Sequence, residues 1–344
     1  MLREEGVPLA RVLVPLLLAV LGIAGEDASP IFVDPSSGLA AVALDGERPF
    51  RSADLEPGGT WRLLFGRERP EVSVRVRPAT GDGLPVLDAF VDTRDPFTGK
   101  EIRVSQEHGA QGTVQGTTWR VTTVRWKDGG SRPLTFLVLR REDQVLVLDG
   151  RDHDLVASEA VRDWAIARLA DLRPEPERTV HPTTGVSYPQ ALAGRERTEG
   201  TVADGGRRLY LGFGRGNRWL QLVARPLTEE ERAAGDVPAV LALAARHVFD
   251  DLSSMGTFQS SEPTLAASWH EERVLDGSHF HWVVVKGLPL RSMVRGVGDP
   301  VPPDLHVLLT TRGGTSLRLE SRDPKPLKDE ALRRELVALL PSAE

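Results

Sequence analysis

The sequence predicts an α+β protein made of two tandem repeats, each an antiparallel β-sheet packed with helices. Three observations predict this fold. Four sequence blocks recur in the same order in both halves, apolar and polar residues alternate with the period of a β-strand, and an apolar stripe with the period of a helix closes each half. With 344 residues, 40% of them hydrophobic, the chain is long enough for about two globular domains.

The N-terminus has the pattern of a targeting segment. An unbroken apolar run from Val12 to Gly25 follows Arg3 and Arg11 and ends in small residues. The run is shorter than the roughly 20 apolar residues that cross a bilayer, and its length suits the core of a signal peptide. We therefore expect residues 1–25 to be a signal peptide and the mature protein to be exported to the periplasm or outside the cell. An uncleaved membrane anchor is the alternative.

The bulk composition excludes several classes of protein. The chain contains no cysteine, which excludes disulfides, thiolate metal ligands and cysteine nucleophiles. An exported protein without disulfides fits a bacterial envelope better than a eukaryotic secretory route. The net charge is −6, and acidic and basic residues are mixed throughout, whereas a nucleic-acid-binding protein concentrates its basic residues. We expect no nucleic-acid partner and no membrane span after the signal peptide is removed.

The internal repeat sets the predicted domain boundaries. The strongest of the four recurring blocks aligns Leu134–Asp152 with Leu305–Asp323 without a gap, and seven of its nineteen positions are identical. A charged segment that contains Pro174 and Pro176 separates the two copies, as a linker does. We predict a first repeat at residues 26–172, a linker at 173–178 and a second repeat at 179–344. The other recurring blocks are Val33–Leu39 with Val180–Val186, Trp61–Pro78 with Leu209–Pro226, and Gly116–Arg125 with Gly277–Lys286.

Each copy begins with strands and ends with a helix. The alternation in 72–76 predicts a strand after the shorter strand 63–65. Hairpin turns are predicted at residues 141–143, at 276–277 and at 313–314. Closing helices are predicted to follow Ser158 and Asp329, which suit the N-cap position. A further helix is predicted over 237–252.

These blocks resemble the PsbP-like family. The Val-x-Pro-x-x-Gly-apolar start at Val33 and Val180, the long hairpins and the helix after Arg-Asp carry the resemblance. The family includes photosystem II extrinsic proteins, a Ran-binding protein and many exported bacterial proteins. The resemblance covers both repeats and implies an antiparallel sheet between helices, with a non-catalytic binding or assembly role. No functional residue carries over, because no functional motif of the family is present.

Four residues of the second repeat form a candidate metal site. If residues 276–277 form a two-residue turn, Glu272 pairs with His281, and His270 and His279 lie on the same face of the hairpin. Two imidazoles two positions apart on a strand, with a carboxylate opposite them, could hold a divalent metal such as zinc. The alternative is that these residues are polar side chains on a solvated face, while Phe280 and Trp282 face the core.

Two other groups of residues carry weaker hypotheses. The acidic run from Asp149 to Asp154 resembles a calcium loop but lacks the ligand spacing of an EF-hand, so we interpret Asp152 as a helix cap or an ion-pair partner. A set of arginines along the strands could form a basic strip for anionic partners, or could simply occupy an exposed sheet face. The set consists of Arg67, Arg69, Arg75, Arg77, Arg207, Arg208, Arg215, Arg218 and Arg225.

The sequence therefore favours an exported, non-enzymatic binding or assembly protein of the bacterial cell envelope, whose protein or envelope partner is unknown. No cofactor is expected. The alternative is a metal-binding protein or metallohydrolase that uses the cluster of His270, Glu272, His279 and His281.

Overall fold

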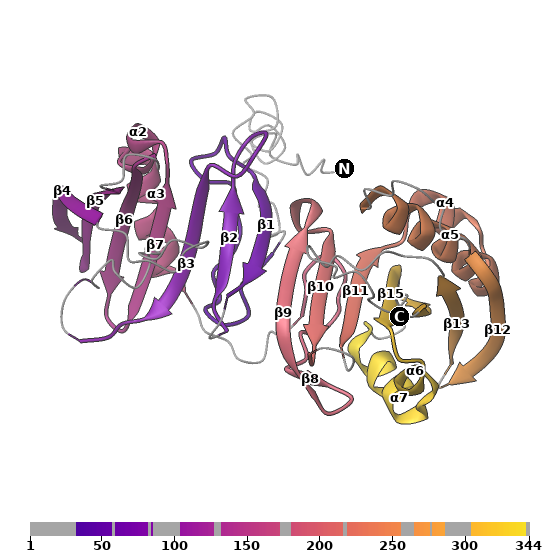
Figure 1. Ribbon diagram of the computed structural model, residues 1–344. Coiled ribbons are helices and arrows are strands. Elements are labelled where there is room, and N and C mark those ends of the chain that lie inside the picture. The colour runs from indigo at the N-terminus through magenta and orange to yellow at the C-terminus, as the bar shows by residue number, and fades with distance from the viewer. Residues whose placement is uncertain are drawn as a thin grey trace, which may run out of the picture. The chain divides into compact units, whose positions relative to one another are not determined.

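Antiparallel strand pairing dominates the computed structural model of the protein (Figure 1). For residues 249–255 and 265–273 only the backbone is described. The described residues are 32–56, 59–81, 84, 104–126, 132–172, 180–215, 219–255, 265–275, 277–285 and 304–341.

The strands form a single 15-stranded sheet in the order β12-β13-β14-β15-β11-β10-β9-β1-β2-β3-β7-β6-β5-β4, with β8 paired to β9 outside this path. The strands before residue 172 are β1 (Phe50–Leu55), β2 (Trp61–Phe65), β3 (Val72–Pro78), β4 (Val104–Val114), β5 (Thr117–Trp126), β6 (Leu134–Arg141) and β7 (Gln144–Gly150). Those after residue 180 are β8 (Ala191–Leu192), β9 (Arg195–Ala203), β10 (Arg208–Phe213), β11 (Leu220–Pro226), β12 (Leu265–Leu275), β13 (Ser278–Val285), β14 (Leu305–Arg312) and β15 (Thr315–Ser321).

This architecture corrects the predicted fold class. We predicted an α+β protein in which each of two tandem repeats forms its own antiparallel sheet packed with helices, as a PsbP-like sandwich. That prediction is wrong, because β1 pairs with β9 and all the strands on the path belong to one sheet. Within this sheet the neighbours follow the same order on both sides of the junction, β1-β2-β3-β7-β6-β5-β4 on one side and β9-β10-β11-β15-β14-β13-β12 on the other.

The local predictions agree with the structure. The predicted turns lie between β6 and β7, between β14 and β15, and between β12 and β13. Ser158 caps helix α3 (Glu159–Ala170), and Asp329 caps helix α7 (Glu330–Leu339). The helix predicted at 237–252 is α5 (Val237–Met255), where Asp236 accepts a hydrogen bond of 2.7 Å from the N–H of Ala239. Three short helices, α2 (His153–Val156), α4 (Glu229–Ala233) and α6 (Lys325–Lys328), and the 3-10 turn η2 (Asp204–Gly206) complete the described elements.

We call the junction of β1 and β9 the seam. Its register pairs Ala53 with Val202, and one hydrophobic core cluster contains side chains from both sides of it. The ring of Trp61 packs edge-on against Tyr188, with 5.9 Å between centroids. A Cβ atom on Gly200 of β9 would lie only 2.7 Å from the Trp61 ring, so β9 approaches this closely only because residue 200 is glycine.

Helices cover both faces of the sheet near β13. Leu241 and Val248 of α5 pack in one core cluster with Val283. On the opposite face, the guanidinium of Arg333 in α7 lies 5.7 Å from the centre of the Phe280 ring. Neighbouring residues on a strand point to opposite faces, so β13 is buried between α5 and α7. In the first half, α2 and α3 contact β6 and β7.

The chain forms the same short turn ahead of β1 and ahead of β8. In the first turn the buried carboxylate of Asp34 accepts a hydrogen bond of 2.5 Å from the hydroxyl of Ser37. In the second, Nδ1 of the buried His181 accepts hydrogen bonds from the hydroxyl of Thr184 at 3.0 Å and from its N–H at 3.3 Å. The two turns therefore use the same bonding pattern with different acceptors, and only the second places an imidazole in the core.

We predict that His181 makes the protein less stable in mild acid. Burial lowers the pKa of its imidazole to about 4, whereas the unfolded chain takes up this proton near pH 6.5. Stability is therefore fully present above about pH 6.5 and falls as the pH drops toward 4, by roughly 3 kcal/mol in total. His181→Asn keeps a hydrogen-bond acceptor but does not titrate. Urea unfolding at pH 7.5 and pH 4.5 should show a smaller pH dependence in the variant, and an equal dependence in both proteins would contradict the prediction.

Candidate functional site

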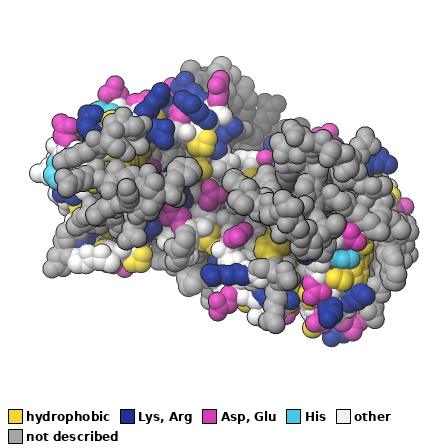
Figure 2. All heavy atoms as spheres, in the orientation of Figure 1, with side chains coloured by type: hydrophobic (Ala, Val, Ile, Leu, Met, Phe, Trp, Pro, Cys, Tyr) yellow, Lys and Arg dark blue, Asp and Glu magenta, His cyan; other side chains and the backbone are white. Residues whose placement is uncertain are grey.

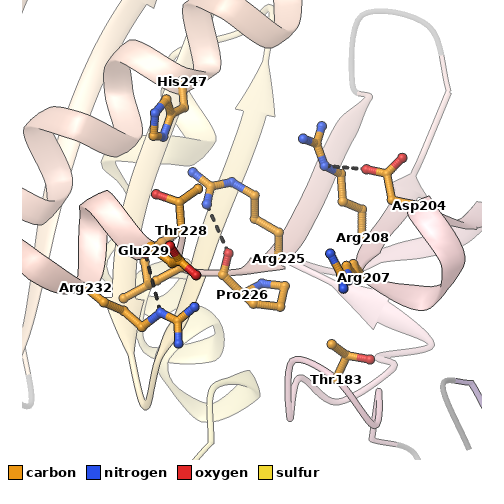
Figure 3. A pocket seen from close by; sticks show the side chains of 11 residues that line it. Thr183, Asp204, Arg207, Arg208, Arg225, Pro226, Thr228, Glu229, Arg232 and His247 are labelled. Carbon is orange, nitrogen blue, oxygen red and sulfur yellow. Dashed lines mark hydrogen bonds and ion pairs between the residues drawn. The ribbon is translucent and has the colours of Figure 1, made fainter.

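A cavity of about 780 Å³ lies among β10, β11, α4 and α5 (Figure 3). Arg207 and Arg208 stand on one side of it, and Arg225, Arg232 and Glu229 on the other. This volume is within the range of about 300–1,000 Å³ that is typical of small-molecule sites. The cavity combines a size suited to a ligand with an excess of positively charged side chains.

The local sequence builds one wall of the cavity. Pro226 ends β11, and Thr228 begins α4 with a capping box. The hydroxyl of Thr228 accepts a hydrogen bond of 3.2 Å from the N–H of Glu231, and the Glu231 carboxylate accepts one of 2.8 Å from the N–H of Thr228. This reciprocal pair fixes the first turn of α4 and places Glu231 behind the cavity.

Glu231 holds two side chains of the cavity wall. Its fully buried carboxylate accepts hydrogen bonds from both terminal nitrogens of Arg225, at 2.7 and 2.5 Å. It also bonds Nδ1 of His247 at 2.9 Å. Burial raises the pKa of the Glu231 carboxyl, but the hydrogen bonds from Arg225, Thr228 and His247 outweigh burial and lower this pKa to about 2. The carboxylate is therefore ionised at neutral pH, and Nδ1 of His247 donates to it.

Two of the arginines that line the cavity form no ion pair with a carboxylate among the described residues. Arg208 is paired with Asp204 at 2.7 Å, and Arg225 with Glu231. Arg232 donates only to the backbone oxygen of Thr228, at 3.4 Å, and the exposed side chain of Arg207 has no such pairing in the described part of the chain. Within the described residues, no carboxylate competes with a ligand for the guanidiniums of Arg207 and Arg232.

The predicted metal cluster is placed only in part. His279 and His281 lie on β13, as the predicted hairpin requires, and His279 pairs with Val274 of β12. The register shifts between Trp269 and Arg273, so the simple pairing of Glu272 with His281 does not occur in the described ladder. The side chains of His270 and Glu272 lie outside the described residues. Among the described side chains there is no group of three or more His, Cys, Asp or Glu arranged to hold a metal, and the four-residue site stays a prediction.

The arginines of the predicted basic strip lie in different environments. Arg75 is buried and bonds Asp149 at 2.9 Å, Arg77 bonds Glu56 at 3.1 Å, and Arg67 pairs with Glu47. On the face drawn in Figure 2, basic side chains lie among acidic ones over the described surface. Three arginines of the predicted strip line one cavity together with Arg232. They are Arg207, Arg208 and Arg225. Arg218 lies outside the described residues.

Several members of the site are not predicted from the sequence, among them Glu231, Arg232 and His247. These three residues lie outside the recurring blocks. A signal for Glu231 existed, since Thr228 and Glu231 have the spacing of a capping box. No local pattern shows that Glu231 also meets Arg225 and His247, because that contact requires the packing of α4 and α5 beside β11.

Comparisons with known proteins identify no relative. No family model matches the chain, and neither a curated protein nor a solved structure matches it. The resemblance to PsbP-like proteins stays a prediction.

We predict that Glu231→Gln destabilises the protein by about 3 kcal/mol at pH 7, because it leaves the guanidinium of Arg225 without its counter-charge. The carboxylate stabilises the fold above about pH 4.5, and its contribution is lost as the pH falls through about 2. The difference between wild type and variant in urea unfolding should therefore shrink between pH 5 and pH 2. Glu229→Gln, on the exposed side of α4, is the matched control and should change stability by less than about 0.5 kcal/mol. Equal losses in both variants would contradict the assignment.

Proposed function

We propose that the protein is an exported binding protein of the cell envelope, and that the cavity of Arg207 and Arg232 receives the anionic groups of its ligand. The observation that carries the proposal is that only some of the arginines lining the cavity are paired with carboxylates. Arg208 and Arg225 are held by carboxylates, whereas Arg207 and Arg232 pair with none among the described residues.

The chemistry of guanidinium supports an oxyanion ligand. A guanidinium presents its N–H donors in a planar fork that matches a carboxylate or a phosphate, and it stays charged at all relevant pH values. Arg207 and Arg232 approach the cavity from opposite sides (Figure 3). A ligand with two acidic groups, such as a di- or tricarboxylate, would use both.

The wall of the cavity is rigid on one side. Arg225 is fixed by two hydrogen bonds to Glu231 and by a third, of 3.0 Å, to the carbonyl of Pro226. A site whose supporting side chains are already ordered loses less conformational entropy when a ligand binds. This arrangement supports binding and requires no chemical step.

Export is the part of the proposal that rests on sequence. The apolar run from Val12 to Gly25 and the absence of cysteine support passage into a bacterial envelope. Within the described residues, none of the helices has both the length and the apolar character needed to span a membrane.

We predict that citrate binds wild-type protein and that Arg207→Ala/Arg232→Ala weakens binding by a factor of roughly 100. Each lost charge-assisted hydrogen bond removes about 1.5 kcal/mol or more, which is about tenfold in affinity. Isothermal titration calorimetry at low salt measures this, with glucose as an uncharged probe.

Arg246→Ala is the matched control, because Arg246 is an exposed arginine of α5 that does not line the cavity. It should leave citrate binding unchanged. The proposal fails if citrate does not bind, or if the double variant and the control bind it equally.

A further inference from the structure

A second cavity, of about 430 Å³, lies where β2, β3, β6 and β7 meet their connecting loops. It shares no residue with the cavity of Arg207 and Arg232. Its lining includes four arginines and three carboxylates. The charged residues are Arg62, Arg69, Arg132, Arg151, Glu71, Asp149 and Asp152.

The three carboxylates already have partners within the protein. Glu71 accepts a hydrogen bond of 2.7 Å from Arg48, and Asp152 accepts one of 3.1 Å from the N–H of Leu155 as the cap of α2. The buried Asp149 forms the most elaborate of these contacts. Its carboxylate accepts hydrogen bonds from the hydroxyl of Ser73 and, at 2.9 Å, from the guanidinium of Arg75.

Asp149 also attracts the first of the lining arginines. A terminal nitrogen of Arg62 lies 3.7 Å from the second carboxylate oxygen. Because Ser73 and Arg75 bond one oxygen of Asp149 and Arg62 faces the other, the negative charge of this residue is balanced inside the protein. It does not repel an anion as an isolated carboxylate would.

The other three arginines that line this cavity have no counter-charge among the described residues. Arg69, Arg132 and Arg151 are exposed, and none of them pairs with a carboxylate in the part of the chain that the structure describes. They come from three separate connections: Arg69 precedes β3, Arg132 precedes β6 and Arg151 follows β7. The sheet therefore brings together three cations that are far apart in sequence.

We propose that this cavity is a second binding site, specific for a phosphate-bearing small molecule, with Arg69, Arg132 and Arg151 as its ligand contacts. A phosphate monoester carries between one and two negative charges at pH 7 and has three oxygens that accept strong hydrogen bonds. Three guanidinium forks supply enough positive charge to neutralise this group and enough donors for its three oxygens. A monocarboxylate would leave at least one of the three cations without a partner.

The site goes beyond the proposed function, because it lies on other strands and shares no residue with the cavity of Arg207 and Arg232. The acidic run from Asp149 to Asp154 resembles a calcium loop in sequence. The structure gives a different use for this segment: Asp149 and Asp152 are bonded within the protein, and Arg151 between them faces the cavity.

Pyrophosphate is the probe for the test, titrated by calorimetry into wild type and into Arg69→Ala/Arg151→Ala at low salt. The variant should bind at least 100-fold more weakly, and Arg132→Ala alone should bind about tenfold more weakly. Acetate at the same concentrations should give no binding. Circular dichroism and a thermal melt check that each variant is folded.

Arg67→Ala is the matched control. Arg67 lies in the same β2–β3 connection as Arg69 but does not line the cavity, and its side chain pairs with Glu47. It should bind pyrophosphate within threefold of wild type. Arg207→Ala/Arg232→Ala should also keep this binding, which separates the second site from the proposed function. The inference is overturned if wild type does not bind pyrophosphate, or if Arg69→Ala/Arg151→Ala binds it as wild type does.

Discussion

The seam between β1 and β9 is the constraint on which the rest of the structure depends. In its own half β1 pairs only with β2 among the described strands, and β9 pairs with β10 and, at Arg195 and Glu196, with the two-residue β8. Without the seam, the rest of the outer side of each strand would present unpaired backbone groups. The seam pairs Ala53 with Val202 and Asp54 with Thr201, and it buries aromatic rings that belong to different halves, including Trp61 and Tyr188. Gly200 makes the contact sterically feasible. One hydrophobic cluster consequently runs through both halves.

The two cavities are built in the same way, at the ends of strands of the sheet. Loops and short helices at the ends of strands bring together arginines that are distant in sequence, and buried carboxylates hold some of them in place. Glu231 holds Arg225 beside one cavity, and Asp149 holds Arg75 beneath the other. Such buried pairs are costly to break, because each charge then loses its partner in a poorly solvated position. The lining arginines that pair with no carboxylate among the described residues are exposed, where a ligand can reach them.

Sequence reasoning predicted the local structure and missed the long-range pairing, for a physical reason. Hairpin turns, and helix caps such as Ser158 and Asp329, depend on neighbours within a few residues, so their sequence signals are local. The pairing of Ala53 with Val202 leaves no such signal, since either strand would look the same at the edge of its own sheet. The capping box that contains Glu231 was likewise visible, but its bonds to distant side chains were not. The predicted metal cluster stays a prediction, because the side chains of His270 and Glu272 lie outside the described residues.

Scanning calorimetry of the purified protein tests the seam most directly. If the two halves are one folding unit through this contact, the protein unfolds in a single transition whose calorimetric and van't Hoff enthalpies agree. Two separate transitions, or a calorimetric enthalpy about twice the van't Hoff value, would contradict the account, because the halves would then unfold independently.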